Sequence, residues 1–138
     1  MSVLNVLNAA IYTKLTGGTA LTALLSGGTA GIYYLQAKDQ ASFPYVVWSL
    51  MAGAPNNDYP HDSRDEIVFV RGYATTPALA GTIDAQISTL LHRGTLTVTG
   101  YTNWWTARET ETAFIENAPD GTRVFMAGAQ YRVRLDNG

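Results

Sequence analysis

Cysteine is absent from the 138-residue chain, and charged side chains are scarce. The lack of cysteine excludes disulfides and thiolate metal sites. Charged residues make up 14% of the chain, against about a quarter in typical soluble proteins, and Lys14 and Lys38 are its two lysines. Because the cores of protein interfaces are depleted in charge, a largely neutral polar surface favours assembly with other chains.

Long hydrophobic runs are missing as well. No stretch approaches the ~18 apolar residues that a membrane helix needs, and no basic-then-apolar signal peptide opens the chain. Nine Lys and Arg against eleven Asp and Glu give a net charge of -2, which argues against sequence-independent binding of nucleic acid. We therefore expect a soluble chain that is made in the cytoplasm and has no membrane contact.

The length of 138 residues predicts one domain over residues 1–138, large enough to bury a core without a covalent cross-link. Residues 3–15 place an apolar side chain at every third or fourth position, which predicts a helix. Residues 79–91 repeat this pattern behind Thr76 and Pro77, a pair typical of a helix N-cap and first turn. The other expected elements are a helical turn at 20–25 capped by Thr19 and strands at 32–35, 45–51, 65–74, 96–99, 106–116 and 123–135.

This order of elements predicts an α+β fold. We expect a mixed, mostly antiparallel sheet of about five to six strands, with the two main helices packed on one face. Both faces of the 65–74 strand are largely apolar, so that strand is expected to be central. Residues 52–64 contain many Gly, Pro, Asn and Asp residues and are expected to form a long loop, of the kind that is often functional.

Catalytic motifs are lacking. The chain has no Gly-x-Ser-x-Gly, no His-Glu-x-x-His and no phosphate-binding Gly-Lys-[Ser/Thr]. His61 with Asp58 and Asp62 fits a metal or acid–base cluster, but a solvated turn is the simpler interpretation. His92 is most simply a favourable charge at the end of a helix. We therefore expect no enzyme, no catalytic residue, no cofactor and no bound metal.

The segment 106–116 is unusual for a strand, because both of its faces are polar. Glu109 and Glu111 are expected on one face, about 6.6–6.8 Å apart, a spacing also found for the carboxylates of glycosidases. An exposed ribbon that pairs with the arginines of the following strand is favoured over that alternative. Those arginines, which would otherwise form a weak phosphate-binding stripe, are Arg123, Arg132 and Arg134.

Two adjacent tryptophans, Trp104 and Trp105, precede this ribbon. On a regular strand they point to opposite faces, so one is expected in the core and the other in solvent. An exposed tryptophan is a common anchor in binding sites. A core packed on both sides of the strand is the alternative.

Several short segments, spread over nearly the whole chain, together match the pattern of a known family. The segments that carry this pattern are Leu7-x-x-Ala10-Ile11-x-x-x-Leu15, Ala20-Leu21-Thr22-Ala23-Leu24-Leu25-Ser26-Gly27, Ile32-Tyr33, Ala41-Ser42-Phe43-Pro44-Tyr45-Val46-Val47, the Pro-capped helix 79–91, Gly121-Thr122-Arg123 and Tyr131-Arg132-Val133-Arg134-Leu135. Together they resemble the tail-completion family of long-tailed double-stranded DNA bacteriophages, which is related to the tail terminators. Phe43-Pro44-Tyr45-Val46 carries most of this resemblance.

The resemblance implies a tail-terminator-like α+β protein of the virion, assembled in the host cytoplasm. Such a protein forms a ring, usually of six copies, on the last ring of the tail tube. There it stops tube polymerisation and offers a docking surface to the neck of the DNA-filled head. The implied partners are further copies of the chain, the tail tube protein and a head-neck or connector protein, while DNA passes through the lumen without specific binding.

Candidate contact residues follow from this expectation. Axial contacts with the tube or neck are assigned to the 52–64 loop, chiefly to Asn56, Asn57, Asp58, Tyr59 and His61. Contacts between neighbours in the ring are assigned to Trp104, Trp105, Arg108, Glu109 and Glu111. The alternatives are a head-side neck or connector component, a small hydrolase that uses His61 and the nearby Asp residues, and a monomeric binding module.

Overall fold

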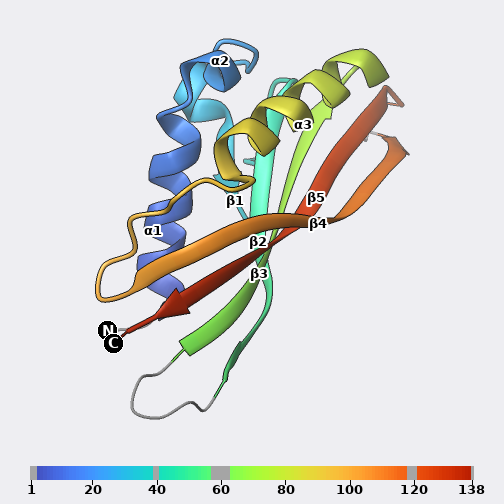
Figure 1. Cartoon of the computed structure of the whole chain (residues 1–138). Helices are drawn as coiled ribbons and strands as arrows, with labels where there is room; N and C mark the ends of the chain where they lie inside the picture. The colour runs from blue at the N-terminus through green and yellow to red at the C-terminus, as the bar shows by residue number, and fades with distance from the viewer. Residues whose placement is uncertain (1–2, 39–40, 57–62, 118–120, 138) are drawn as a thin grey trace.

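A five-stranded sheet with helices on one face forms the framework of the molecule (Figure 1). The computed structural model describes residues 3–38, 41–56, 63–117 and 121–137. The helices are α1 (Val3–Thr16), α2 (Thr19–Thr22) and α3 (Pro77–Leu91), with a 3-10 turn, η1 (Gly28–Gly31). The strands are β1 (Ile32–Tyr34), β2 (Tyr45–Pro55), β3 (Ser63–Ala74), β4 (Thr102–Asn117) and β5 (Arg123–Asp136).

The sheet is mixed, as the sequence predicts. Its strand order is β1-β2-β3-β5-β4, with β1 parallel to β2 and every other pair antiparallel. β3 lies in the centre, and β4 forms one edge over its whole length. The α+β fold and the placement of both main helices on one face are therefore confirmed (Figure 1).

The core lies between this face of the sheet and the two main helices. Val68 and Val70 of β3 point into it and alternate with half-buried residues, which is the period of a strand. Ile83 and Ile87 come from α3, whose predicted N-cap, Thr76, accepts a hydrogen bond from the backbone N–H of Leu79 at 3.2 Å. Burying each such aliphatic side chain contributes about 1.5–3 kcal/mol, so the helix period and the strand period together fix this layer.

The expected strand at 96–99 is not formed. The segment joins α3 to β4 as irregular backbone, with Leu96 and Val98 buried in the core. The backbone N–H of Leu96 donates to the side-chain oxygen of Asn103, at 2.9 Å, instead of to a neighbouring strand. The alternation of apolar and polar residues at 96–99 therefore arises because Leu96 and Val98 are buried, although the segment is not a strand. The sheet consequently has five strands rather than six.

The expected 52–64 loop is largely strand. β2 continues to Pro55 and β3 begins at Ser63, so the two form one long hairpin. Gly53 lies inside β2, opposite Glu66, whose carboxylate occupies the space that a Cβ at residue 53 would need. Glycine here allows the close approach of a side chain and does not mark a turn. The expected cap of α2 is also displaced by one residue, since Thr19 is helical and Gly18 is the N-cap.

Candidate functional site

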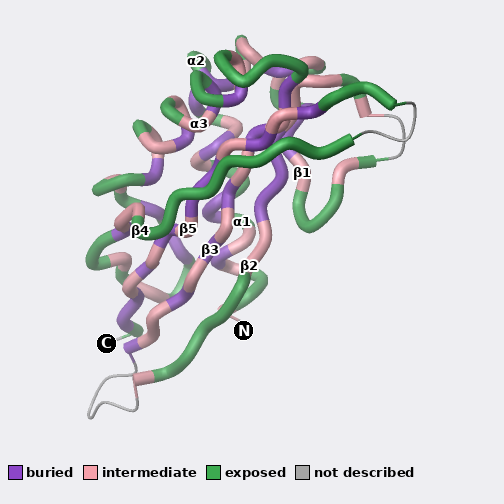
Figure 2. The backbone as a smooth tube through the Cα atoms, turned by 90° about the vertical axis from the view of Figure 1, so that its right-hand side faces the viewer, coloured by how far each residue is buried: buried purple, intermediate pink, exposed green. Residues whose placement is uncertain are grey.

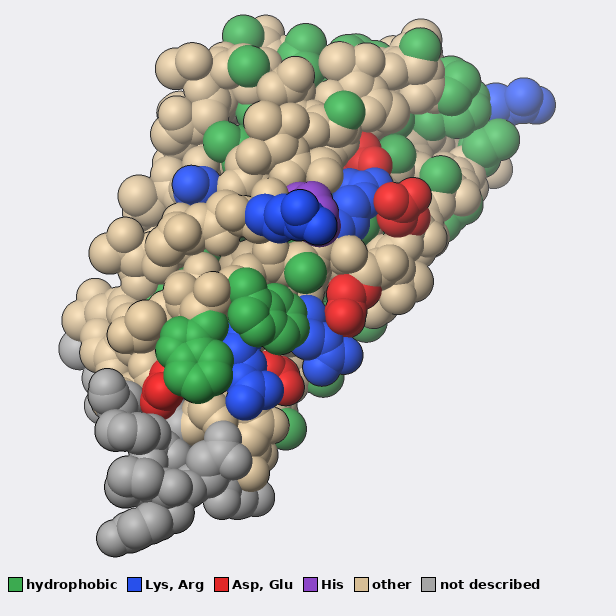
Figure 3. Space-filling model, in the orientation of Figure 1, with side chains coloured by type: hydrophobic (Ala, Val, Ile, Leu, Met, Phe, Trp, Pro, Cys, Tyr) green, Lys and Arg blue, Asp and Glu red, His purple; other side chains and the backbone are tan. Residues whose placement is uncertain are grey.

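The face of the sheet opposite α1 and α3, here called the open face, carries three of the predicted contact residues: Trp104, Trp105 and Glu109. On β5, Arg132 and Arg134 alternate with the buried Tyr131 and Val133, so the arginines point to this face. Figure 3 shows hydrophobic side chains among basic and acidic ones, above the start of β4. Figure 2 shows that β4 runs along the surface with most of its length exposed.

Both tryptophans of β4 are exposed. Trp104 is 55% and Trp105 41% accessible, so the expectation that one of them lies in the core is wrong. The pairing of β4 with β5 shifts between Asn103 and Trp105, which makes Trp104 the extra residue of a β-bulge. Trp105 stands opposite Arg134, and the guanidinium of Arg134 lies 5.5 Å from the ring centre of Trp104. The bulge therefore brings the two indoles to the same arginine.

The arginines of β5 are paired with carboxylates. Arg132 donates from Nε to Glu109 at 3.0 Å, as the predicted pairing across the hairpin requires. Arg134 instead donates from Nη1 to both carboxylate oxygens of Asp65 on β3, each at 3.2 Å. Since these ion pairs are partly exposed, they contribute little to stability, but they neutralise the stripe that phosphate binding would require.

A second bulge separates the two glutamates that were expected on one face. The register of β4 shifts between Arg108 and Thr110, at Glu109. Glu109 pairs with Arg132, whereas Glu111 accepts from Nε of Arg108 at 2.9 Å. The side chain of Glu111 is 70% exposed. The expectation that Glu109 and Glu111 lie on one face of the strand is therefore wrong.

Arg108 links β4 to both α3 and β5 through its side chain. Its guanidinium donates to both oxygens of Asp84 on α3 and, at 2.9 Å, to the hydroxyl of Tyr131. The hydrogen bonds with Asp84, followed by that with Glu111, raise the pKa of Arg108 further above its ordinary value. Its guanidinium is occupied within the chain, where it holds β4 against α3, and its direct contact with a neighbouring copy stays a prediction.

His92 follows the last residue of α3 and contacts β4. Its Nδ1 accepts a hydrogen bond from the backbone N–H of Arg108 at 3.0 Å. This contact ties the end of α3 to β4, and the interpretation of His92 as a favourable charge stays a prediction.

The predicted axial contacts lie mostly outside the described residues. These are Asn57, Asp58, Tyr59 and His61, together with Asp62. Asn56 is described, and it joins the two strands of the hairpin. Its backbone N–H donates to the carbonyl of Ser63 at 2.8 Å, and its Nδ2 donates to the Ser63 hydroxyl at 3.2 Å.

An aromatic cluster at the other end of the sheet was missed by sequence reasoning. Phe43 stacks on Tyr45 with ring centres 5.0 Å apart, and Tyr45 lies 5.2 Å from Tyr73 and 5.8 Å from Tyr33. Burial raises the pKa values of Tyr45 and Tyr73 above their ordinary value. The signal was available in the Phe43-Pro44-Tyr45 segment, which places two aromatic rings at the start of a predicted strand.

Residues 109–117 of β4 are exposed, as expected for the ribbon over residues 106–116. All nine of them, Glu109 included, lie in solvent along the free edge of the sheet. Phe114 is 46% and Ile115 58% accessible, although they are adjacent and point to opposite faces of the strand. A long edge strand with apolar side chains on both faces is a site at which another polypeptide chain can add.

Within the described ranges, no group of three His, Cys, Asp or Glu side chains is placed to hold a metal ion. No helix in that part of the chain is long and apolar enough to cross a membrane.

An α+β subunit with an uncovered edge strand and exposed aromatic anchors is of the class that works through contacts with other chains. The chain belongs to the family described as tail completion protein gp17, whose model matches residues 9–136. It is therefore a structural protein of a bacteriophage tail, located in the virion.

A solved structure supports the fold. A chain in the virion of a native gene transfer agent (GTA) particle has a TM-score of 0.76 to this chain at 19% sequence identity. The alignment covers 98% of each chain, so the two share the whole fold. The search of curated proteins gave no match.

Proposed function

We propose that the protein forms a ring, of six copies, on the head-proximal end of the tail tube. There it stops tube polymerisation and provides the surface on which the head-neck or connector protein docks. Membership of the tail-completion family supports this role. The observation that carries it is the free edge of β4, where residues 109–117 are uncovered and apolar side chains point to both faces.

The proposed mechanism is the replacement of one surface by another. One face of the ring reproduces the surface by which tube subunits join, and the other face differs, so that no further tube ring can add. Trp104 and Trp105 contact the neighbouring copy, and Glu109 and Glu111 line that contact. The connection between β2 and β3, with Asn56, Asn57, Asp58, Tyr59 and His61, makes the axial contacts. Contacts alone suffice, so the mechanism needs neither an enzyme activity nor a cofactor.

DNA passes through the lumen of this ring without specific binding. The pairing of Arg132 and Arg134 with Glu109 and Asp65 supports this part of the proposal. The net charge of -2 adds to it, since like charge disfavours the capture of phosphate.

Native mass measured over a concentration series is the direct test of the ring. Six copies of the 14.9 kDa chain have a mass of about 89 kDa, and electron microscopy of that species should show a central hole. Capping is tested by adding the protein to polymerising tube protein. The expected result is tubes of arrested length with the protein at one end, and unchanged growth would contradict the proposal.

The neck alternative makes a different prediction in the same system. A terminator is present in purified tails that lack heads, whereas a neck or connector component stays with the heads. The hydrolase alternative predicts that His61→Ala abolishes an activity and leaves assembly intact.

A further inference from the structure

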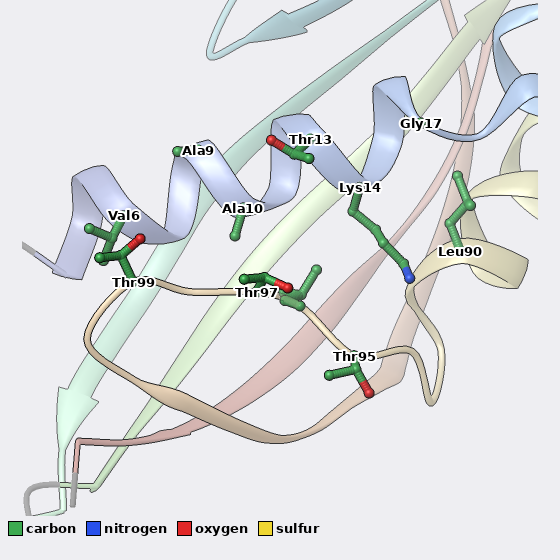
Figure 4. Close-up of a pocket in the computed structure, with 11 residues that line it drawn as sticks. Val6, Ala9, Ala10, Thr13, Lys14, Gly17, Leu90, Thr95, Thr97 and Thr99 are labelled. Carbon is green, nitrogen blue, oxygen red and sulfur yellow. The ribbon is translucent and has the colours of Figure 1, made fainter.

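A groove lies between α1 and the connection from α3 to β4. It has a volume of about 510 Å³. Val6 and Ala10 of α1 line one wall, and Leu90 and Leu96 add further apolar surface. Much of the remaining lining is polar and includes Thr13, Thr95, Thr97 and Thr99. Figure 4 shows Lys14 extending from α1 across to the connection. Among the residues that the structure describes, Lys14 is the one charged residue that lines the groove.

The exposed end of β4, residues 109–117, is here called the arm. It presents Phe114 and Ile115 to solvent on opposite faces. Its charged residues are Glu109, Glu111 and Glu116, with no Lys or Arg among the nine positions. Glu109 is paired with Arg132 and Glu111 with Arg108, so Glu116 is the carboxylate that the arm offers to another chain. The arm thus combines exposed apolar surface with one negative charge, which complements the apolar wall of the groove and the ammonium group of Lys14.

Arm and groove lie at opposite ends of the molecule. In Figure 1 the arm reaches the right-hand end of the sheet, whereas α1 and the connection from α3 to β4 lie at the left. The arm of one copy therefore cannot fill the groove of the same copy. A contact between two different surfaces of identical chains is heterologous, and it produces a closed ring when the rotation between copies closes.

We infer that the arm of each copy lies in the groove of the next copy around the ring, with Ile115 against its apolar wall and Glu116 near Lys14. This inference rests on the proposed ring and identifies the contact that closes it. Pairing of two arms across a two-fold axis is disfavoured, because it would place Glu109, Glu111 and Glu116 of both copies along one shared edge.

Because the chain has no cysteine of its own, any disulfide formed in a variant must join the introduced cysteines. The test pair is Ile115→Cys with Thr97→Cys, since Thr97 lines the groove and is exposed. Oxidation should give a ladder of covalent oligomers that ends at the mass of the ring. The matched control pairs Ile115→Cys with Ala85→Cys, an exposed position on α3. Covalent dimers from Ile115→Cys alone, or equal ladders from the test and control pairs, would overturn the inference.

A second experiment tests the same contact by substitution, without a disulfide. Ile115→Asp should shift the native mass from about 89 kDa to 14.9 kDa at concentrations where the parent chain is assembled. Ala85→Asp should leave the ring intact. Because both positions are exposed, circular dichroism should show the same fold in each variant. A ring that survives Ile115→Asp and gives no ladder overturns the arm–groove contact alone, whereas a parent chain that never assembles overturns the ring itself.

Discussion

Arg108 on β4 and Asp84 on α3 form a two-pronged ion pair, with hydrogen bonds of 3.0 Å from Nη1 and 2.6 Å from Nη2. Both side chains are largely buried, at 14% and 16% exposure. The pair lies directly beside the bulge at Glu109, where the exposed arm begins. It therefore ties β4 to α3 at the point where the arm begins.

Breaking this pair should destabilise the fold. Asp84→Ala or Arg108→Ala leaves the partner charge in a poorly hydrated place, at an expected cost of about 2 kcal/mol in the free energy of unfolding. Arg108→Lys should not restore the loss, because a point charge cannot make the two-pronged contact. Denaturant unfolding of both single variants and of the double variant measures the coupling. Additive effects would contradict a direct interaction.

Alkaline pH should destabilise the protein through its buried tyrosines. Burial raises the pKa of Tyr131 above the ordinary value of 10.0, and it does the same for Tyr45 and Tyr73. Above pH 10 the unfolded chain therefore loses these protons before the folded chain does, so the free energy of unfolding falls as the pH rises. Below pH 10 this contribution is fully present.

Tyrosinate absorbance followed beside circular dichroism checks this prediction. Part of the absorbance change should coincide with unfolding, and Tyr131→Phe should make the loss of stability with pH less steep. If all eight tyrosines of the chain titrated near pH 10 with the fold intact, burial would not be controlling them.

The predictable part of the fold is the part that burial imposes on the sequence. α3 could be predicted because Ile83, Ile87 and Leu91 recur at the helix period and Thr76 supplies a cap. β3 could be predicted as central because both of its faces are apolar. In both elements the local spacing of apolar side chains is enough to predict the secondary structure.

The errors arose where a distant residue decides the local structure. Gly53 suggested a loop, but Glu66 from the next strand needs that space. Leu96 and Val98 suggested a strand, but α1 and the core take up their side chains. The candidate site was misjudged for the same reason, since the bulge that exposes Trp104 exists only in the register with β5. The sequence of β4 alone does not show how its residues align with those of β5.

Gly53→Ala should destabilise the β2–β3 hairpin. The carboxylate of Glu66 lies where the new methyl group would be, and it is held there by Nε of Arg64 at 2.8 Å. Displacing it should cost about 1–3 kcal/mol in the free energy of unfolding. In a Glu66→Ala background the obstacle is gone, so the same substitution should be nearly neutral. Chemical denaturation of the four variants measures this, and an equal cost in both backgrounds would show that Glu66 is not the cause.

The last prediction concerns the exposed tryptophans. Trp104→Ala and Trp105→Ala should each change the free energy of unfolding by no more than about 1 kcal/mol, since the contact of Trp104 with Arg134 is partly exposed. Buried aromatic anchors commonly carry about 2 kcal/mol or more of an interface, so the dissociation constant of the ring should rise at least tenfold. Leu4→Ala, at a similarly exposed position on α1, is the control and should leave assembly unchanged. Native mass over a dilution series measures the difference. Rings that dilute identically for both tryptophan variants and the parent chain would remove the two indoles from the neighbour contact, and that contact would then depend on the arm alone.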